Sequence, residues 1–450
     1  MPTFPPPMPS STARSVRGWR RLPFASLDRH QWINLGLAAL CASHVARFAY
    51  FVVFTGLFKD AGVDFRSFWS AAEVAQNLGF ARVYDLSALE VYQRPLFHLY
   101  PSLGEPREYV TVPTPYLPVF VAALIPLLPL GPTVGFTLWT ALSGIAIFFY
   151  LYRFTLAVGR QGSGRLRLVP QLLSMPVAAG LLSGQVSAFL LVFVGEFILS
   201  LVAGRRVVAG LWLGLLLWKP QLLILVLPGL LLARRKDTLI GFGVTTLGVL
   251  GGSAYLLGFS GLQSLATLWT GYAGGMASNS PEVMMNWRAV WLNLGPLVSR
   301  DVQLALLVAG MLVTAVLPLW LWYQAGPRGN GGLPEALLAT FAATNVVAWH
   351  SHLHMAVPTI AVVAYAFARG VIPHWLAYLW LLGPVLAYLV TLPTTMSQQY
   401  CGLATFLMNV VVELWAAVVF LRARPRPVEV AGPEPGPIAR SELESASEVN

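Results

Sequence analysis

The sequence has few charged residues and almost no cysteine. Only 11% of its 450 residues are Asp, Glu, Lys or Arg, and 56% are hydrophobic, whereas soluble domains carry roughly a quarter charged residues. Cys41 and Cys401 stand alone in apolar stretches, which excludes a disulfide framework and a cysteine metal motif. No soluble basic domain carries the net charge of +10, so we expect no nucleic-acid partner. Apolar runs near the ~20 residues that cross a bilayer recur. The sequence therefore predicts an all-α polytopic membrane protein.

About twelve segments are predicted to cross the membrane. They cover about 32–58, 133–157, 168–182, 186–203, 207–218, 220–233, 238–257, 302–323, 334–349, 353–368, 373–393 and 400–421. Residues 113–130 are apolar but short and Pro-rich, so we interpret them as re-entrant or interfacial. Irregular backbone at membrane depth is tolerated where it lines a cavity.

The remaining segments define the expected domain organisation. A long first outer loop covers 59–112, and a second outer loop covers 258–300. Together with the spans they form a membrane domain of residues 31–422. Residues 1–30 are basic and rich in Pro and Ser, and residues 423–450 are rich in Pro, Glu and Ser. Both ends are predicted to be disordered, because such segments cannot bury enough apolar surface to fold.

Basic turns set the predicted orientation. They contain Arg160, Arg165, Arg167, Arg205, Arg206, Arg234, Arg235, Lys236, Arg328 and Arg369. Positive residues mark cytoplasmic ends, so these turns and both termini are predicted to be inside. The outer side then collects Asp64, Gln185, Lys219, Asn279, Glu282, Asn286, Arg288, His350, His352, Gln398 and Gln399. We expect these residues to line one outward-facing cavity.

Several outer elements occur in an order that is typical of a known family. They are VDFRSFWSAAE with Asp64, the Gly79…Tyr84-Asp85 element, Pro115-Tyr116-Leu117-Pro118, Trp139, Gly184-Gln185, and AGLWLGLLLWKPQ with Lys219-Pro220. The ordered set, over about residues 60–400, resembles glycosyltransferase family 87. These enzymes are polyprenyl-phosphate-mannose-dependent mannosyltransferases of the GT-C superfamily.

The resemblance implies a GT-C-like bundle and a sugar, expected to be mannose, carried on a polyprenyl phosphate. It also implies an outer-face active site and a single inverting displacement. We expect a glycolipid or glycan acceptor and no cofactor or metal. The expected location is the bacterial inner membrane, among membrane lipids, with the site facing the periplasm or cell exterior.

This reaction needs one carboxylate base. A lipid phosphate leaves without a general acid, whereas the acceptor hydroxyl must lose its proton as it attacks. The family's first-loop aspartate falls on Asp64, which we predict to be the base. The structural alternative is pairing with Arg66 or Lys59, and Asp60 is the rival base. Within the same site, Arg66, Tyr116 and Asn279 are predicted to contact substrate.

Cationic or hydrogen-bonding groups must hold the departing phosphate. Lys219, between two short apolar runs, is predicted to do so, with a snorkelling lysine as the alternative. Arg288 is predicted to bind the donor phosphate or an acceptor anion, and otherwise lies on a solvated face. Gln185 either orients a sugar hydroxyl or caps the helix that begins at Val186.

The motif WHSHLH holds three histidines. On a helix, His350 and His354 would share a face, being four residues apart. We predict that they hydrogen-bond the phosphate or sugar. A structural role is the alternative, and zinc binding lacks a carboxylate or cysteine companion at ligand spacing.

Ionisable residues inside predicted spans are a further expectation. Arg47 and His44 lie in the first span, where ionisable side chains are costly and often functional. Arg47 is predicted either to reach the donor phosphate or to pair with Glu196 or Glu413.

Two other functions compete with a transferase. A transporter or lipid flippase would be favoured by inverted repeats and by polar residues at the midplane of several helices. The sequence shows no convincing repeat, and its polar residues gather at one face. A non-catalytic scaffold is the third possibility.

Overall fold

A computed structural model describes most of the chain. The described residues are 61–98, 109–159, 165–273, 280–295, 297–326, 332–391 and 396–423, with a few single positions between 36 and 46. All secondary-structure elements within them are helices. Most of the predicted first span, including His44 and Arg47, lies outside the described residues, as do Lys59, Asp60, Asn279 and both predicted disordered ends.

Within the described residues, five helices are long and apolar enough to cross a membrane. They are α5 (Pro132–Gly159), α11 (Lys236–Ala273), α13 (Arg300–Ala325), α16 (His374–Thr391) and α17 (Ser397–Ala423). Their outer faces are apolar: Phe149 of α5, Leu247 of α11 and Val313 of α13 are 63%, 75% and 73% exposed. Contiguous exposed apolar surface of this kind suits contact with lipid. The predicted all-α membrane protein is thus confirmed.

Other apolar helices are too short to cross a bilayer alone. They are α4 (Pro118–Ala122) with η4 (Ile125–Leu130), α8 (Ser187–Val202), α9 (Arg206–Gly214) with η5 (Leu215–Trp218), η6 (Pro220–Leu223) with α10 (Val226–Leu232), α14 (Leu333–Val347), and η9 (Leu353–Ala356) with α15 (Val357–Ala368). At 1.5 Å per residue α8 is about 24 Å long, shorter than the ~30 Å hydrocarbon core. Their ends therefore fall short of at least one membrane surface.

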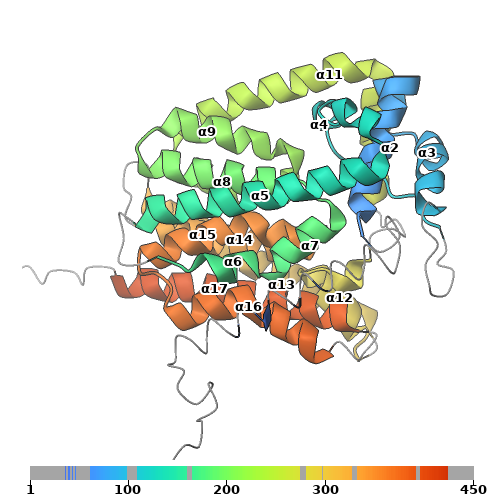
Figure 1. The fold of residues 1–450 in the computed structure, drawn as a ribbon. Coiled ribbons are helices and arrows are strands. Elements are labelled where there is room, and N and C mark those ends of the chain that lie inside the picture. The colour runs from blue at the N-terminus through green and yellow to red at the C-terminus, as the bar shows by residue number, and fades with distance from the viewer. Residues whose placement is uncertain are drawn as a thin grey trace, which may run out of the picture.

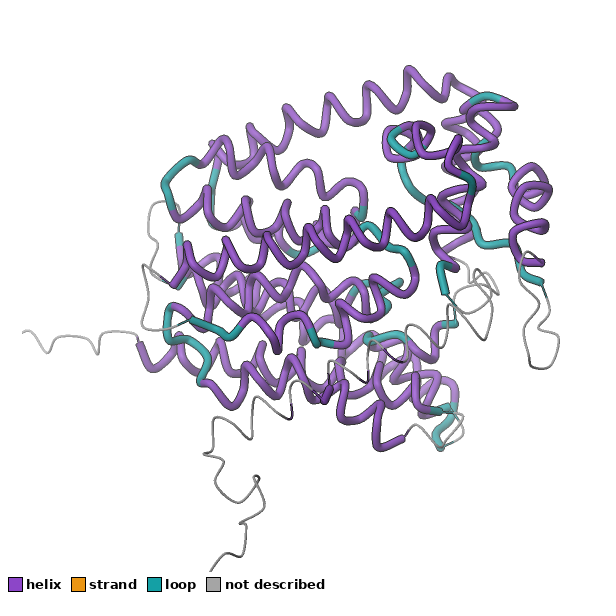
Figure 2. Tube along the Cα trace, viewed as in Figure 1, coloured by secondary structure: helices purple, strands orange, loops and turns teal. Residues whose placement is uncertain are grey.

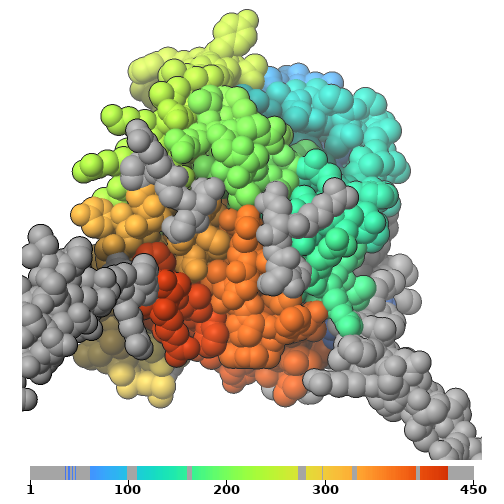
Figure 3. All heavy atoms as spheres, turned by 90° about the vertical axis from the view of Figure 1, so that its left-hand side faces the viewer, coloured from blue at the N-terminus to red at the C-terminus, as the bar shows by residue number. Residues whose placement is uncertain are grey.

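The helices lie side by side in one bundle (Figure 1). Nearly every residue of α14 and α15 is buried, so these two helices form its centre. In the described residues the trace consists of helices joined by loops (Figure 2). Helices α2 (Val63–Leu78), α3 (Leu86–His98) and α4 cover the right-hand end in Figure 1. Figure 3 shows the opposite end, where the green and yellow-green segments lie beside the orange and red C-terminal helices.

Two basic turns meet at one end of the bundle. Arg206 begins α9 and forms an ion pair of 3.7 Å with Asp237 at the start of α11. Arg235, which precedes α11, lies close enough to Arg206 for the two charges to interact. The segments 206–218 and 220–232 therefore form a hairpin that carries basic residues at one end and Lys219 at its turn.

The second predicted outer loop, 258–300, contains helices. A kink at Gly258 (φ +62°) lies where the predicted span ends, but a second helical arm of α11 continues to Ala273. Gly258 permits this left-handed kink without a Cβ clash. The arm is fastened to the Pro-rich segment 113–130, because Nε1 of Trp269 donates to the Pro115 carbonyl at 3.1 Å. Beyond it lie η8 (Pro281–Val283) and α12 (Trp287–Leu294).

The predicted span 168–182 is formed by two helices and not by one. It consists of α6 (Leu168–Leu172) and α7 (Met175–Ser183), with Ser174 extended between them at ψ 146°. Pro176 enforces the break: it stands in the first turn of α7, where its missing N–H costs nothing. The first outer loop also contains helices, namely α2, η3 (Phe80–Arg82) and α3.

Candidate functional site

Asp64 stands in the first turn of α2, where that helix docks onto the end of α7. Gly62 precedes the helix with φ +69°, and its N–H donates to the Leu182 carbonyl at 2.7 Å. The positive end of a helix dipole favours a carboxylate in the first turn. The half-buried Asp64 side chain is thereby fixed beside the α7–α8 turn.

Gly184 allows this close approach. It ends α7 with φ +71°, and a Cβ on it would lie 2.6 Å from Cβ of Phe65. Its carbonyl accepts from Nε1 of Trp139 at 2.9 Å, while Phe65 packs on Phe136 with ring centroids 5.5 Å apart. A side chain at position 184 would therefore push Asp64 and its helix away from the turn.

Two side chains of this turn hydrogen-bond the Asp64 carboxylate: Gln185 and Ser183. The Tyr116 hydroxyl donates to Oε1 of Gln185 at 2.9 Å, so the other end of the amide faces the carboxylate. Gln185 does not cap the next helix, because the N-cap of α8 is Val186 and has no side-chain cap bond. Sequence reasoning missed Ser183, and its position directly before Gly184-Gln185 was the available signal.

Burial raises the pKa of Asp64. The hydrogen bond from Gln185 and then the positive charges of Lys219 and Arg66 oppose this effect, as does Ser183 to a smaller extent. Withdrawal from water makes a carboxylate a stronger base, while the donors and cations around Asp64 favour its ionised form.

Lys219 is buried at the turn of the short hairpin, with only 5% of its surface exposed. Its Nζ lies 3.0 Å from Nε2 of His354 and 5.2 Å from the ring centroid of Tyr116. Burial lowers the pKa of Lys219 to about 8, and the charge of Asp64 opposes the shift. A snorkelling lysine would reach solvent, so that alternative does not describe this side chain.

His350 and His352 lie on an irregular loop, and His354 follows in the short helix η9. Residues 348–352 separate α14 from η9, so the predicted shared helical face of His350 and His354 is wrong. Their rings instead pack in series through His352, with centroids 4.8 Å and 6.0 Å apart. Asn286 holds the loop, because its Nδ2 donates to the carbonyls of Ala348 at 2.8 Å and Trp349 at 3.1 Å.

Arg288 lies at the other end of the histidine series. Its guanidinium carbon stands 4.8 Å from the Trp349 ring centroid. Burial lowers the pKa of His350, and the charges of His352, Lys219 and Arg288 add to this effect. His350 therefore lies near two cations, Lys219 of the hairpin turn and Arg288 of α12.

Arg66 contributes charge to the site but directs its side chain into the first outer loop. Its guanidinium lies 5.2 Å and 5.8 Å from the rings of Phe97 and Tyr109, and it donates to the Val110 carbonyl at 3.3 Å. These contacts fix the segment that leads to Tyr116. A direct Asp64–Arg66 ion pair is absent from the salt bridges of the described residues.

The predicted partners of Arg47 have other environments. Glu196 forms an ion pair with Arg153 and accepts a hydrogen bond from the Tyr150 hydroxyl at 3.2 Å. Glu413 is buried in α17, 2% exposed. Arg47 itself lies outside the described residues.

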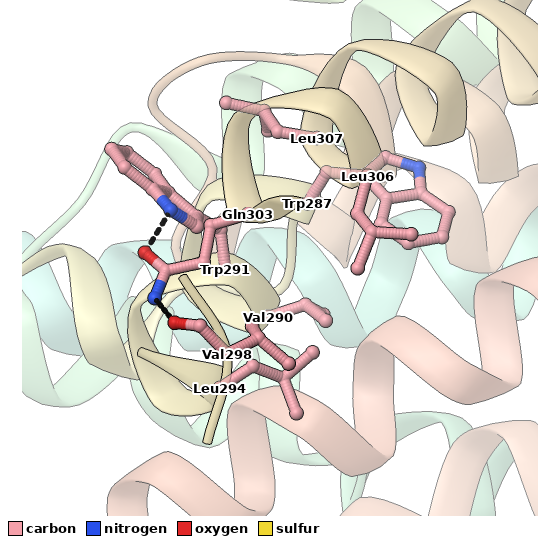
Figure 4. A pocket seen from close by; sticks show the side chains of 8 residues that line it. All are labelled: Trp287, Val290, Trp291, Leu294, Val298, Gln303, Leu306 and Leu307. Carbon is pink, nitrogen blue, oxygen red and sulfur yellow. Dashed lines mark hydrogen bonds between the residues drawn. The ribbon is translucent and has the colours of Figure 1, made fainter. Parts of the chain in front are cut away.

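An apolar cavity of about 210 Å³ lies between α12 and α13 (Figure 4). Two indoles of α12, Trp287 and Trp291, face it, together with Leu306 and Leu307 of α13. Gln303 also lines it and accepts a hydrogen bond from the Trp291 indole. No titratable side chain lines this cavity, so it can hold an apolar chain but supplies no acid or base.

The geometry thus joins residues from six segments of the chain. Of the predicted site residues, Asp64, Gln185, Tyr116, Lys219 and His354 form one contiguous network. His350 and Arg288 continue it through the histidine series. The position of Asn279 is outside the described residues. A proton-accepting carboxylate beside a buried cation and imidazoles can deprotonate a hydroxyl and bind an anion.

A comparison with protein-family models gives one match: glycosyltransferase family 87, over residues 114–349. The matched range covers more than half of the chain and confirms the resemblance seen in the sequence. It contains Tyr116, Gln185, Lys219 and Arg288 but not Asp64. No curated protein and no solved structure matches the chain.

Proposed function

Because the chain belongs to glycosyltransferase family 87 and is a membrane glycosyltransferase, we propose that its donor is a sugar carried on a polyprenyl phosphate. The transferred sugar is mannose, and the acceptor is a glycolipid or a glycan at the outer face. The reaction is a single inverting displacement with Asp64 as the base.

Transfer of the sugar forms one bond and breaks another. The acceptor oxygen forms a bond to the anomeric carbon while the bond between that carbon and the phosphate oxygen breaks. The leaving polyprenyl phosphate keeps the electron pair, and Asp64 accepts the hydroxyl proton. Lys219, assisted by the neutral imidazole of His354, stabilises the negative charge that grows on the phosphate.

One observation carries this proposal: the Asp64 carboxylate and the Lys219 ammonium lie near each other in a buried network without forming an ion pair. Their charges interact, yet Lys219 is bonded to His354 and Asp64 to Gln185 and Ser183. A direct ion pair would neutralise both groups. This separation leaves the carboxylate able to accept a proton and the ammonium able to meet a phosphate.

The lengths of the helices support an outward-facing site that is recessed below the membrane surface. Gln185 precedes α8, Lys219 is the turn of the short hairpin, and His354 lies in η9, which leads into α15, so each stands at the end of a short helix. The basic turns at the other end of that hairpin are assigned to the cytoplasm. On this account the membrane domain, 31–422, has about twelve helical passes, some of them partial, and re-entrant character at 113–130. The site faces the periplasm or cell exterior from a bacterial inner membrane, and both termini are inside.

Donor specificity tests the proposal. Purified protein is supplied with a polyprenyl-phosphate mannose or with the corresponding nucleotide sugar, and the anomeric configuration of the product is determined. We expect transfer with inversion from the lipid-linked donor alone. Transfer only from the nucleotide sugar would overturn the donor assignment. Movement of labelled lipid across vesicles without any sugar transfer would instead support a flippase.

A further inference from the structure

Tyr116 contacts two of the groups that interact with Asp64. Its hydroxyl donates to Oε1 of Gln185 at 2.9 Å, and its ring centroid lies 5.2 Å from Nζ of Lys219. The first contact runs through the hydroxyl and the second through the ring face. The two contacts can therefore be removed separately by mutation.

The Tyr116 ring is itself fixed in place. It packs edge-on against Phe68, with ring centroids 4.9 Å apart. Its centroid also lies 5.0 Å from that of the tilted Phe120 ring. Its carbonyl accepts from the Tyr84 hydroxyl at 2.7 Å. Only 5% of Tyr116 is exposed, so the ring has little freedom to follow a bound substrate.

The hydroxyl decides which end of the Gln185 amide faces Asp64. A carboxamide has one end that only donates and one end that only accepts. With Oε1 occupied by the tyrosine hydroxyl, the NH₂ group is directed to the carboxylate. A reversed amide would place an oxygen against the carboxylate and disfavour its charged form.

We infer that Tyr116 is a positioning residue for the proposed base: its hydroxyl orients the Gln185 amide, and its ring holds the Lys219 ammonium near Asp64. The inference rests on the proposed function, because it concerns the strength of the same base. It differs from the substrate contact expected of Tyr116, since the hydroxyl and the ring face each contact a protein group.

The direction of the effect follows from the groups that face Asp64. These are the charges of Lys219 and Arg66 and the donors of Gln185 and Ser183, and all of them favour the ionised carboxylate. Loss of the oriented Gln185 donor therefore raises the pKa of Asp64. The base is active when ionised, so the acidic limb of kcat/KM against pH moves to higher pH.

The test is the pH profile of Tyr116→Phe, which keeps the ring and removes the hydroxyl. We expect an upward shift of the acidic limb by about one pH unit. Tyr150→Phe is the matched control, because it also removes a buried hydroxyl that hydrogen-bonds a polar side chain, Glu196. Tyr150 lies eleven residues beyond Trp139 on α5, about 16 Å from the site. A wild-type limb in Tyr116→Phe, or the same shift in Tyr150→Phe, would overturn the inference.

Three further variants complete the test. Gln185→Met removes the donor itself and should reproduce the shift; if Tyr116→Phe does not fold, a wild-type limb in Gln185→Met overturns the inference. Tyr116→Leu also removes the ring, so the KM for the lipid donor should rise about tenfold above that of Tyr116→Phe. An unchanged KM would refute the role of the ring.

Asp64→Asn separates the proposed base from the positioning role of Tyr116. Wild-type activity in Asp64→Asn refutes the proposed base. An inactive Asp64→Asn, together with a wild-type acidic limb in Tyr116→Phe, refutes only the positioning role.

Discussion

Nζ of Lys219 lies 3.0 Å from Nε2 of His354, although the two residues are 135 positions apart in the chain. An ammonium only donates, so His354 accepts through Nε2 and is neutral with its proton on Nδ1. Both side chains are buried at ends of short helices, with 5% and 6% of their surfaces exposed. The contact between these two side chains thus forms a cationic centre inside the bundle, at two points where helices are interrupted.

The charge of Lys219 predicts the alkaline side of the pH profile. Burial lowers its pKa to about 8, so above that pH the ammonium loses its proton and kcat/KM should fall. Lys219→Arg should move this limb to higher pH, because a guanidinium stays protonated throughout the accessible range. Lys219→Met should lower kcat/KM by about 100-fold. The measurement is kcat/KM at pH values from about 6 to about 10, a range that brackets the pKa of Lys219. An alkaline limb in Lys219→Arg that is identical to that of the wild type would contradict this role.

Substitution of Gly184 is expected to lower stability, and Gly204 is the matched control. Gly184 and Gly204 have φ +71° and +73°, but a Cβ at 184 meets Phe65 whereas nothing lies within 4 Å at 204. Gly204→Ala should cost about 1 kcal/mol from backbone strain alone. Gly184→Ala should cost roughly 1–3 kcal/mol more, because it also overpacks the docking point of α2.

Thermal unfolding of both variants in the same detergent measures this difference. Equal losses at the two glycines would show that the packing of α2 on the α7–α8 turn is not tight. Gly184→Ala should also reduce transfer activity, since the same contact positions Asp64.

Arg288 predicts a binding effect. Its guanidinium lies over Trp349 and next to the histidine series. Arg288→Met should raise the KM for the donor or the acceptor about tenfold, as expected for loss of one charge-assisted contact. Arg94 is the control, because it also stacks on an aromatic ring, Tyr109 at 4.8 Å, and pairs with Glu90 on an exposed face. Steady-state kinetics with each substrate varied in turn should show wild-type KM values in Arg94→Met; wild-type values in Arg288→Met would argue against anion binding there.

Much of the candidate site could be predicted from the sequence, because membrane topology is encoded in simple features. Apolar runs and basic turns placed Asp64, Gln185 and Lys219 on one side, and the structure brings these three together with His354. A lone lysine between two apolar runs was informative for the same reason. Such a charge is costly in a membrane unless it has a partner.

The remaining features of the fold and the site depend on packing, which a pattern of apolar residues does not specify. The second arm of α11 contains enough polar residues to look like a loop, yet Trp269 fastens it to Pro115. The histidine motif has helical spacing, but Nδ2 of Asn286 donates hydrogen bonds to the carbonyls of Ala348 and Trp349, and these bonds keep the segment from forming a regular helix. The contribution of Ser183 and the direction of the Tyr116 hydroxyl follow from side-chain geometry across distant segments.

The most direct test of the account is the transfer rate of Asp64→Asn with a polyprenyl-phosphate sugar donor. Asp301→Asn is the matched control, because Asp301 is likewise an acidic residue in the first turn of a helix but is exposed on α13. Loss of a general base should lower kcat by about 10²- to 10⁴-fold, with donor KM nearly unchanged, while Asp301→Asn keeps the wild-type rate. A folded Asp64→Asn protein that transfers sugar at the wild-type rate would contradict the assignment of Asp64 as the base.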